Sequence, residues 1–199
     1  MFDLIPFLSY VLVVTFTPGP NNIMSMVNAT QFGYKKTLKF IFGIATGFFV
    51  IMFSSCYFNL YLFNLFPKVK MLMSILGASY MLYLAYIIMT AHNKKNTDNP
   101  RLNSYYAGIA LQFVNFKVIL YGITVTSNFI IPYYQSNFLL LLFSIILTMF
   151  AVASTSCWAF FGVFFERFLS KYQKPFNITM GLLLIYCAYS ISGIKLLFA

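Results

Sequence analysis

The chain is a succession of long apolar segments separated by short polar ones. Each apolar segment is about as long as the roughly 20 residues that a helix needs to cross a bilayer. The pattern predicts an all-α polytopic membrane protein that forms a single membrane domain over residues 1–199. We expect the first segment to be a retained helix rather than a cleaved leader, because Asp3 and no Lys or Arg precedes it. The six predicted transmembrane helices are Leu4–Ala29, Ile41–Phe63, Met71–Ala91, Tyr105–Ile131, Phe138–Phe165 and Asn177–Phe198.

The most polar linker, 92–104, lies near the middle of the chain and divides the predicted helices into two sets of three. With an odd number of spans in each half, the second half enters the membrane upside down relative to the first. We therefore predict two inverted three-helix repeats, one at about 1–91 and the other at about 105–199.

Composition and charge agree with a membrane protein. The chain is 61% hydrophobic and 8% charged, whereas soluble domains are about 45–50% apolar and about 25% charged. The net charge of +10 does not indicate a nucleic-acid partner, because basic residues in short loops report membrane orientation. Nine of the 13 basic residues fall in the predicted loops 30–40, 92–104 and 166–176. We therefore expect these loops in the cytoplasm and both termini outside.

The first predicted span contains Thr17-Pro18-Gly19-Pro20-Asn21-Asn22 near its middle. Two prolines remove two backbone donors and clash with the preceding turn, so we predict a break here. In hydrocarbon, such a break survives only where it is buried in protein or lines a cavity. A helix that restarts with Asn21 or Asn22 as its N-cap would point its positive end at the bilayer centre and could bind a carboxylate. A proline kink used only for packing is the alternative.

The fourth predicted span has a matching polar segment, Gln112-Phe113-Val114-Asn115-Phe116-Lys117. Lys117 is the only charged side chain predicted deep in the membrane, where a lysine costs roughly 2.5–3.5 kcal/mol. The three acids, Asp3, Asp98 and Glu166, all lie at ends or in loops. Lys117 must therefore find carbonyls, polar side chains, water or the anionic group of a substrate. A lysine that snorkels to the interface is the alternative.

Together the two segments predict one site for a zwitterion. Lys117 and the N-terminus of the restarted helix would bind the carboxylate, and the exposed carbonyls and amides would bind the amino group. The residues predicted to bind substrate are Asn21, Asn22, Gln112, Asn115 and Lys117, and those predicted to shape the helix break are Thr17, Pro18, Gly19 and Pro20.

Other features indicate packing rather than chemistry. Gly43 and Gly47 predict a close helix-packing face at the start of the second span. The three cysteines, Cys56, Cys157 and Cys187, lie in apolar segments without Cys-x-x-Cys spacing and are predicted to be small buried residues. The single histidine cannot make a metal site, and no nucleotide-binding loop or nucleophile with a base is present. We therefore predict no enzyme activity, no cofactor and no metal.

Residues 17–22, Gly43-x-x-x-Gly47 and Asn115-Phe116-Lys117 resemble the LysE/RhtB superfamily of bacterial amino-acid exporters, and the resemblance covers the whole chain. Within it, Leu111–Asn115, Lys117, Ile119–Gly122 and Ile185–Ala188 are most similar to the subgroup that exports cysteine and O-acetylserine. The resemblance implies a secondary exporter of small neutral amino acids in the bacterial cytoplasmic (inner) membrane, surrounded by lipid. Substrate would bind between two broken helices, and rocking of the halves would alternate access. Association into a homo-oligomer is left open.

Two positions depart from the pattern of the superfamily. Phe116 stands where many members have proline, which leaves open whether the fourth helix is truly broken. Phe48 stands where many members have an acid, which removes the obvious carboxylate for a proton relay and leaves the driving force undecided. The alternatives to cysteine and O-acetylserine export are a homoserine or threonine exporter, a membrane thiol–disulfide enzyme and a structural membrane subunit.

Overall fold

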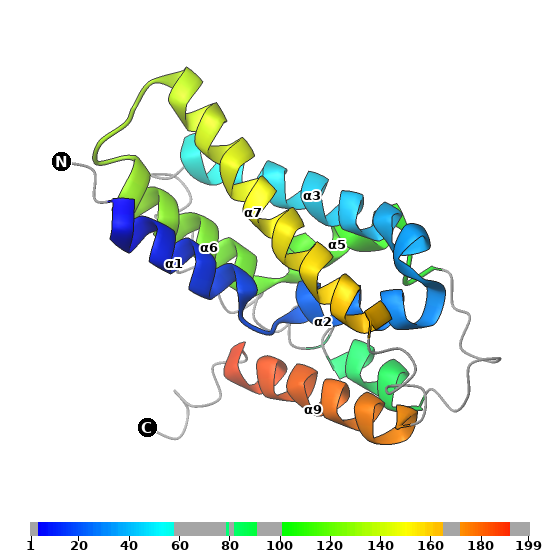
Figure 1. Ribbon diagram of the computed structural model, residues 1–199. Helices are drawn as coiled ribbons and strands as arrows, with labels where there is room; N and C mark the ends of the chain where they lie inside the picture. The colour runs from blue at the N-terminus through cyan, green and yellow to red at the C-terminus, as the bar shows by residue number, and fades with distance from the viewer. Residues whose placement is uncertain (1–3, 58–78, 80–81, 91–100, 165–171, 192–199) are drawn as a thin grey trace, which may run out of the picture.

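The computed structural model describes residues 4–57, 79, 82–90, 101–164 and 172–191, and every regular element among them is helical (Figure 1). The first half contains α1 (Leu4–Phe16), α2 (Pro20–Phe32), α3 (Tyr34–Tyr57) and a helical segment at 82–90. The second half contains α5 (Tyr105–Val114), α6 (Phe116–Val125), the π-helix η1 (Thr126–Ile130), α7 (Asn137–Phe164) and α9 (Gln173–Ile191). The predicted all-α class is confirmed.

Two helices, α3 and α7, are each long and apolar enough to cross a membrane. Two further candidate spans are bent: α1 and α2 meet at 47°, and α5 meets the α6–η1 helix at 66°. The described part of the chain therefore holds between two and four candidate spans. The predicted third span and the end of the sixth fall largely on residues outside this part.

The lysine-rich loop predicted at 30–40 is instead helical. Gly33 alone separates α2 from α3. Its φ of 80° explains why a glycine ends α2. Helix α3 then begins at Tyr34, so exposed Lys35, Lys36 and Lys39 occupy its first two turns. The prediction was wrong because a helix can continue past its apolar stretch into polar residues. Lys174, assigned to a loop, likewise lies in α9.

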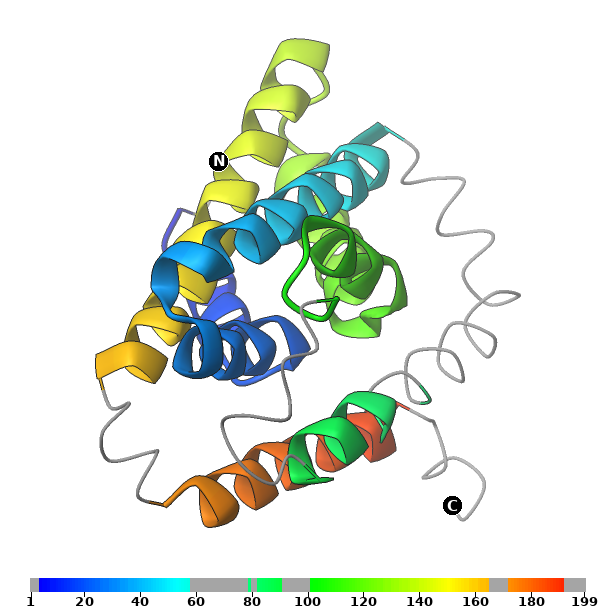
Figure 2. The same ribbon diagram turned by 90° about the vertical axis from the view of Figure 1, so that its right-hand side faces the viewer.

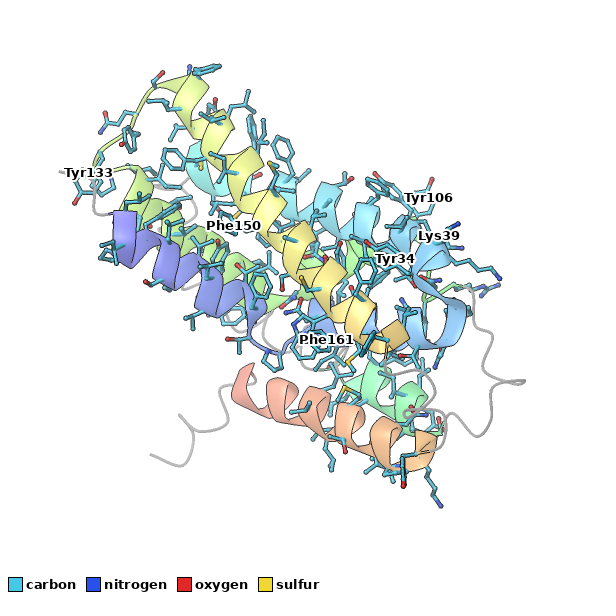
Figure 3. The ribbon with its side chains drawn as sticks, in the orientation of Figure 1. Tyr34, Lys39, Tyr106, Tyr133, Phe150 and Phe161 are labelled. Carbon is cyan, nitrogen blue, oxygen red and sulfur yellow. The ribbon has the colours of Figure 1, made fainter. Side chains whose placement is uncertain are left out.

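The two long helices cross at the centre of the bundle, where α7 passes over α3 (Figure 1). Helix α3 packs along α5, and α7 packs along α2. The 82–90 segment and α9 lie side by side, at a distance from the crossing of α3 and α7 (Figure 2). A side chain at Gly181 of α9 would collide with Met89, which shows how closely these two pack. Lys39 and Tyr106 mark one end of the bundle and Tyr133 the other (Figure 3).

Glycines bring α3 and α5 into backbone contact. A Cβ atom at Gly43 would overlap the carbonyl oxygen of Tyr105, and one at Gly108 would overlap that of Phe40. At Gly47 a Cβ atom would lie 2.8 Å from Cγ of Gln112. The small residues thus bring α5 close enough for Gln112, which is fully buried, to face the interior of the bundle.

Candidate functional site

A small cavity of about 40 Å³ lies where the two bent spans meet. This volume is far below the roughly 300–1,000 Å³ of ligand pockets, so a bound amino acid would need the wall to open. The first break, α3, the second break, α6 and α7 all contribute to its wall, which among the described residues contains no acid. The lining residues are Val14, Thr15, Gly19, Pro20, Asn21, Asn22, Phe48, Asn115, Lys117, Val118, Tyr121, Ala151 and Thr155.

The first break frees carbonyl groups at the end of α1, and side chains from other helices bind them. Asn22 Nδ2 donates to the carbonyls of Thr15 and Thr17 at 2.9 and 3.1 Å. From α7, Ser154 Oγ donates to the Thr15 carbonyl at 2.9 Å, and Trp158 Nε1 donates to the Phe16 carbonyl at 3.2 Å. Each of three successive carbonyls therefore has a donor, as burial away from water requires.

Asn22 does not cap its own helix, contrary to the sequence-based expectation for Asn21 or Asn22. The N-cap of α2 is Gly19, which makes no side-chain hydrogen bond, and Pro20 follows at the first helical position. Proline suits that position because its missing N–H would have had no partner in the helix. The Asn22 amide instead donates to the carbonyls at the end of α1, which have lost their helical N–H donors.

The second break has a different construction, based on three amide side chains. Asn21 Nδ2 donates to Gln112 Oε1 at 2.8 Å, and Gln112 Nε2 donates to Asn21 Oδ1 at 3.1 Å. Asn115 Nδ2 donates to the same Asn21 oxygen at 3.0 Å. Gln112 and Asn115 are both buried, at 0% and 1% exposed. Asn21 of the first break therefore forms hydrogen bonds with both amides at the second break. The fourth span bends at Asn115 although Phe116 replaces the proline.

Lys117 joins the two breaks. Its ammonium group donates to the Thr17 carbonyl at 3.0 Å, so the second half of the chain reaches into the first break. Gly19 makes room for this side chain, since a Cβ atom there would lie 3.2 Å from Nζ. The carbonyl is one of the partners that the sequence predicted for Lys117. The structure thus brings Thr17, Gly19 and Lys117 into direct contact.

Two buried polar atoms in the cavity wall lack a hydrogen-bond partner. They are Oδ1 of Asn115 and the hydroxyl of Tyr121. An unpaired buried polar atom costs about 1–3 kcal/mol, so native structures keep few of them. Their position at a cavity beside an ammonium group favours a polar ligand as the missing partner.

Several residues of the site were not predicted. Thr155 lines the cavity and Ser154 binds the first break. Both are hydroxyl side chains in the middle of the apolar fifth span, and that position was a detectable signal. Tyr121 belongs to a segment that resembles the family, but its place at the cavity depends on the bend at Asn115. Phe48, noted because it replaces an acid, lies in the wall itself.

The cysteines only partly match the prediction of burial. Cys56 is buried, where it accepts from Ser144 Oγ at 3.6 Å, but Cys157 is exposed on α7. A thiol is apolar enough for a helix face exposed to lipid, which explains why an apolar segment did not imply burial. The side chain of Cys187 lies outside the described residues.

Residues 12–192 match the LysE type translocator family. The chain belongs to this family, so it is a membrane translocator and not an enzyme. The cysteine/O-acetylserine efflux proteins of Escherichia coli K12 and of Shigella sonnei Ss046 are each 36% identical to it over 185 residues, which cover 93% of this chain and 95% of each relative. No solved structure matches the chain. The match confirms the family that the motifs at 17–22 and 115–117 indicated.

Proposed function

We propose that this protein exports small neutral amino acids from the cytoplasm, with cysteine and O-acetylserine as its main substrates. The observation that carries the proposal is the hydrogen bond from Lys117 to the Thr17 carbonyl, because it places an ammonium group at a break that lines a cavity. The relatives at 36% identity are named for efflux of these two compounds.

The carboxylate of the substrate binds at Lys117 and at the N-terminus of α2. The first helical bond there runs from Ile23 N–H to the Gly19 carbonyl. The N–H groups of Asn21 and Asn22 precede this bond, so they have no carbonyl partner within the helix and can bind an anion. When the carboxylate takes the Lys117 ammonium, the Thr17 carbonyl becomes available to the substrate amino group. Oδ1 of Asn115 is a second acceptor for that group. The site therefore exchanges an internal hydrogen bond for contacts to a zwitterion.

The wall also accounts for selectivity by charge and size. A lysine-like substrate would bring a second cation into a wall that, among the described residues, offers no carboxylate. Burying that charge without a partner is expensive. The limited volume, with Phe48 and Tyr121 in the wall, favours side chains of a few atoms.

Alternating access follows from two inverted three-helix repeats in the bacterial cytoplasmic membrane. The order of elements supports this arrangement: a bent pair, a long helix and a further helix occur at 4–90 and again at 105–191. Each bent pair contributes one break to the cavity, so rocking of the halves changes access around a fixed site. The lysines at the start of α3 would lie on the cytoplasmic side, with both termini outside.

The test is efflux of labelled cysteine, O-acetylserine and threonine from loaded cells that express the wild type, Lys117→Met or Lys39→Met at equal membrane levels. Lys39 is the matched control, because it is an exposed lysine of α3 away from the cavity wall. We expect the wild type and Lys39→Met to release cysteine and O-acetylserine quickly. Lys117→Met should lower both rates about tenfold or more, since a hydrogen bond to a charged group is lost.

Three results would contradict this proposal in different ways. Faster release of threonine than of cysteine would support the homoserine or threonine exporter. Equal rates for Lys117→Met and Lys39→Met would remove Lys117 from the site. No release of any of the three by the wild type would exclude these substrates.

A further inference from the structure

Tyr121 gives the cavity a polar group that the proposed binding of the carboxylate and amino group does not use. Its side chain is 3% exposed and lines the cavity, and its hydroxyl has no hydrogen-bond partner. The Thr15 hydroxyl is the near polar neighbour, but its own proton goes to the Val11 carbonyl, so it cannot donate to Tyr121 and the Tyr121 oxygen keeps its lone pairs open. Tyr121 is therefore positioned to bind a ligand atom.

The ring of Tyr121 is held in place by aromatic neighbours. It stacks on Tyr10 of α1 with centroids 5.9 Å apart and planes 5° apart. Phe48 of α3 lies against it with centroids also 5.9 Å apart. Contacts from two other helices fix the ring, so the hydroxyl is presented at a defined point of the wall.

Lys117 and Tyr121 are four residues apart on α6. Residues at this spacing lie on one face of a helix, with Cβ atoms about 5–6 Å apart. Both residues line the same cavity, so an amino acid whose carboxylate contacts the Lys117 ammonium would place its side chain in the space that Tyr121 also lines.

We propose that Tyr121 selects the side chain of the exported amino acid through its hydroxyl. A phenol hydroxyl can both donate and accept. It accepts the S–H of cysteine and donates to the ester carbonyl of O-acetylserine, so one group serves two unlike side chains. This inference rests on the proposed export function and adds the residue that distinguishes these substrates from apolar amino acids of equal size.

The test compares wild type, Tyr121→Phe and Tyr10→Phe proteins purified and placed in lipid vesicles. Vesicles are loaded with labelled cysteine, O-acetylserine or 2-aminobutyrate, in which a methyl group replaces the thiol of cysteine. Tyr10→Phe is the matched control, because Tyr10 shares the ring stack but is not among the lining residues. Both substitutions keep the ring, so the aromatic packing is preserved.

We expect Tyr121→Phe to slow O-acetylserine efflux about tenfold and cysteine efflux about threefold, because the thiol is only a weak donor. Efflux of 2-aminobutyrate should be unchanged or faster, and Tyr10→Phe should resemble the wild type. Equal losses for all three compounds, or no loss, would overturn the role of Tyr121. Failure of the wild type to release cysteine and O-acetylserine would instead overturn the export function on which the inference depends.

Discussion

The two helix breaks bend their spans by different means. At the first, two prolines within three residues forbid a continuous helix, and donors from Asn22, Ser154, Trp158 and Lys117 then bind the freed carbonyls. At the second, Asn115 and Phe116 both have backbone N–H groups, and nothing local prevents a straight helix. The bend of 66° is the larger of the two, yet it contains no proline.

The difference shows that a break can be specified locally or from a distance. Asn21 belongs to the first break but bonds to Gln112 and Asn115, 91 and 94 residues further along the chain. Because these amides are buried, the geometry that satisfies them is strongly preferred. The second break therefore depends on the first, whereas the first does not need the amide cluster to end α1.

The largest effect is expected for Asn21→Leu, which would break this dependence. The substitution leaves the buried amides of Gln112 and Asn115 without their shared partner, at about 1–3 kcal/mol each. We expect a clear loss of thermal stability in detergent micelles, together with a straighter fourth span. Spin labels on Tyr106→Cys and Asn128→Cys, in a background without native cysteines, should move apart.

Asn128→Leu is the matched control for the stability measurement. Asn128 is exposed, and its side chain donates to the Thr124 carbonyl within its own turn. Its loss should be small. If Asn21→Leu and Asn128→Leu melt at the same temperature, the amide cluster does not hold the second break.

Two glycine substitutions should have opposite signatures. Gly19 has an extended backbone with φ of −169°, so Gly19→Ala is conformationally allowed, but its Cβ atom would displace the end of Lys117. We expect efflux to fall several-fold with little change in stability.

Gly33→Ala has open space around the new methyl group, but the backbone there has a positive φ. The substitution should therefore cost about 1–3 kcal/mol of stability, while efflux per folded molecule is retained. Efflux and melting measurements on both variants check this. If both variants lose efflux, or both lose stability, to the same extent, the contrast between the two glycines is wrong.

A smaller loss is expected for Ser154→Ala. The Thr15 carbonyl would lose one of its two donors, while Asn22 would continue to bind it, and the Asn22 oxygen would lose its 3.2 Å bond from Ser154. We expect a stability loss of about 0.5–1.5 kcal/mol, measured by thermal unfolding. Thr148→Val, which removes only a bond within α7, provides the comparison. A larger loss in Thr148→Val would show that the first break does not use this donor.

The smallest effect is expected for Pro18→Ala. Pro18 is exposed between α1 and α2, and the carbonyls around it are already bound by side chains of α2, α6 and α7. The variant should lose only about 0.4–1 kcal/mol through the greater freedom of the unfolded chain. A loss comparable to that of Asn21→Leu would mean that this proline, and not the side-chain donors, maintains the first break.

The same contrast explains what the sequence could predict. The first break was readable because its cause, Pro18 and Pro20, lies in one short segment. The second could be suspected from its polar residues, but its bend depends on Asn21, a partner distant in sequence. Apolar length located α3 and α7, yet it misplaced the start of α3, since polar turns can extend a helix. The cavity position of Tyr121 follows from the bend and could not be predicted from local pattern.

The hydrogen bond from Trp158 to the Phe16 carbonyl has a practical consequence. The chain contains a single tryptophan, and its indole N–H donates a hydrogen bond to the carbonyl of the last residue of α1. Indole emission shifts in wavelength and intensity with the polarity of its surroundings and with its hydrogen bond. The intrinsic fluorescence of the unlabelled protein is therefore an optical signal from the first break. Adding substrate to the protein in micelles while recording this emission would follow changes at the first break in real time, with no introduced probe.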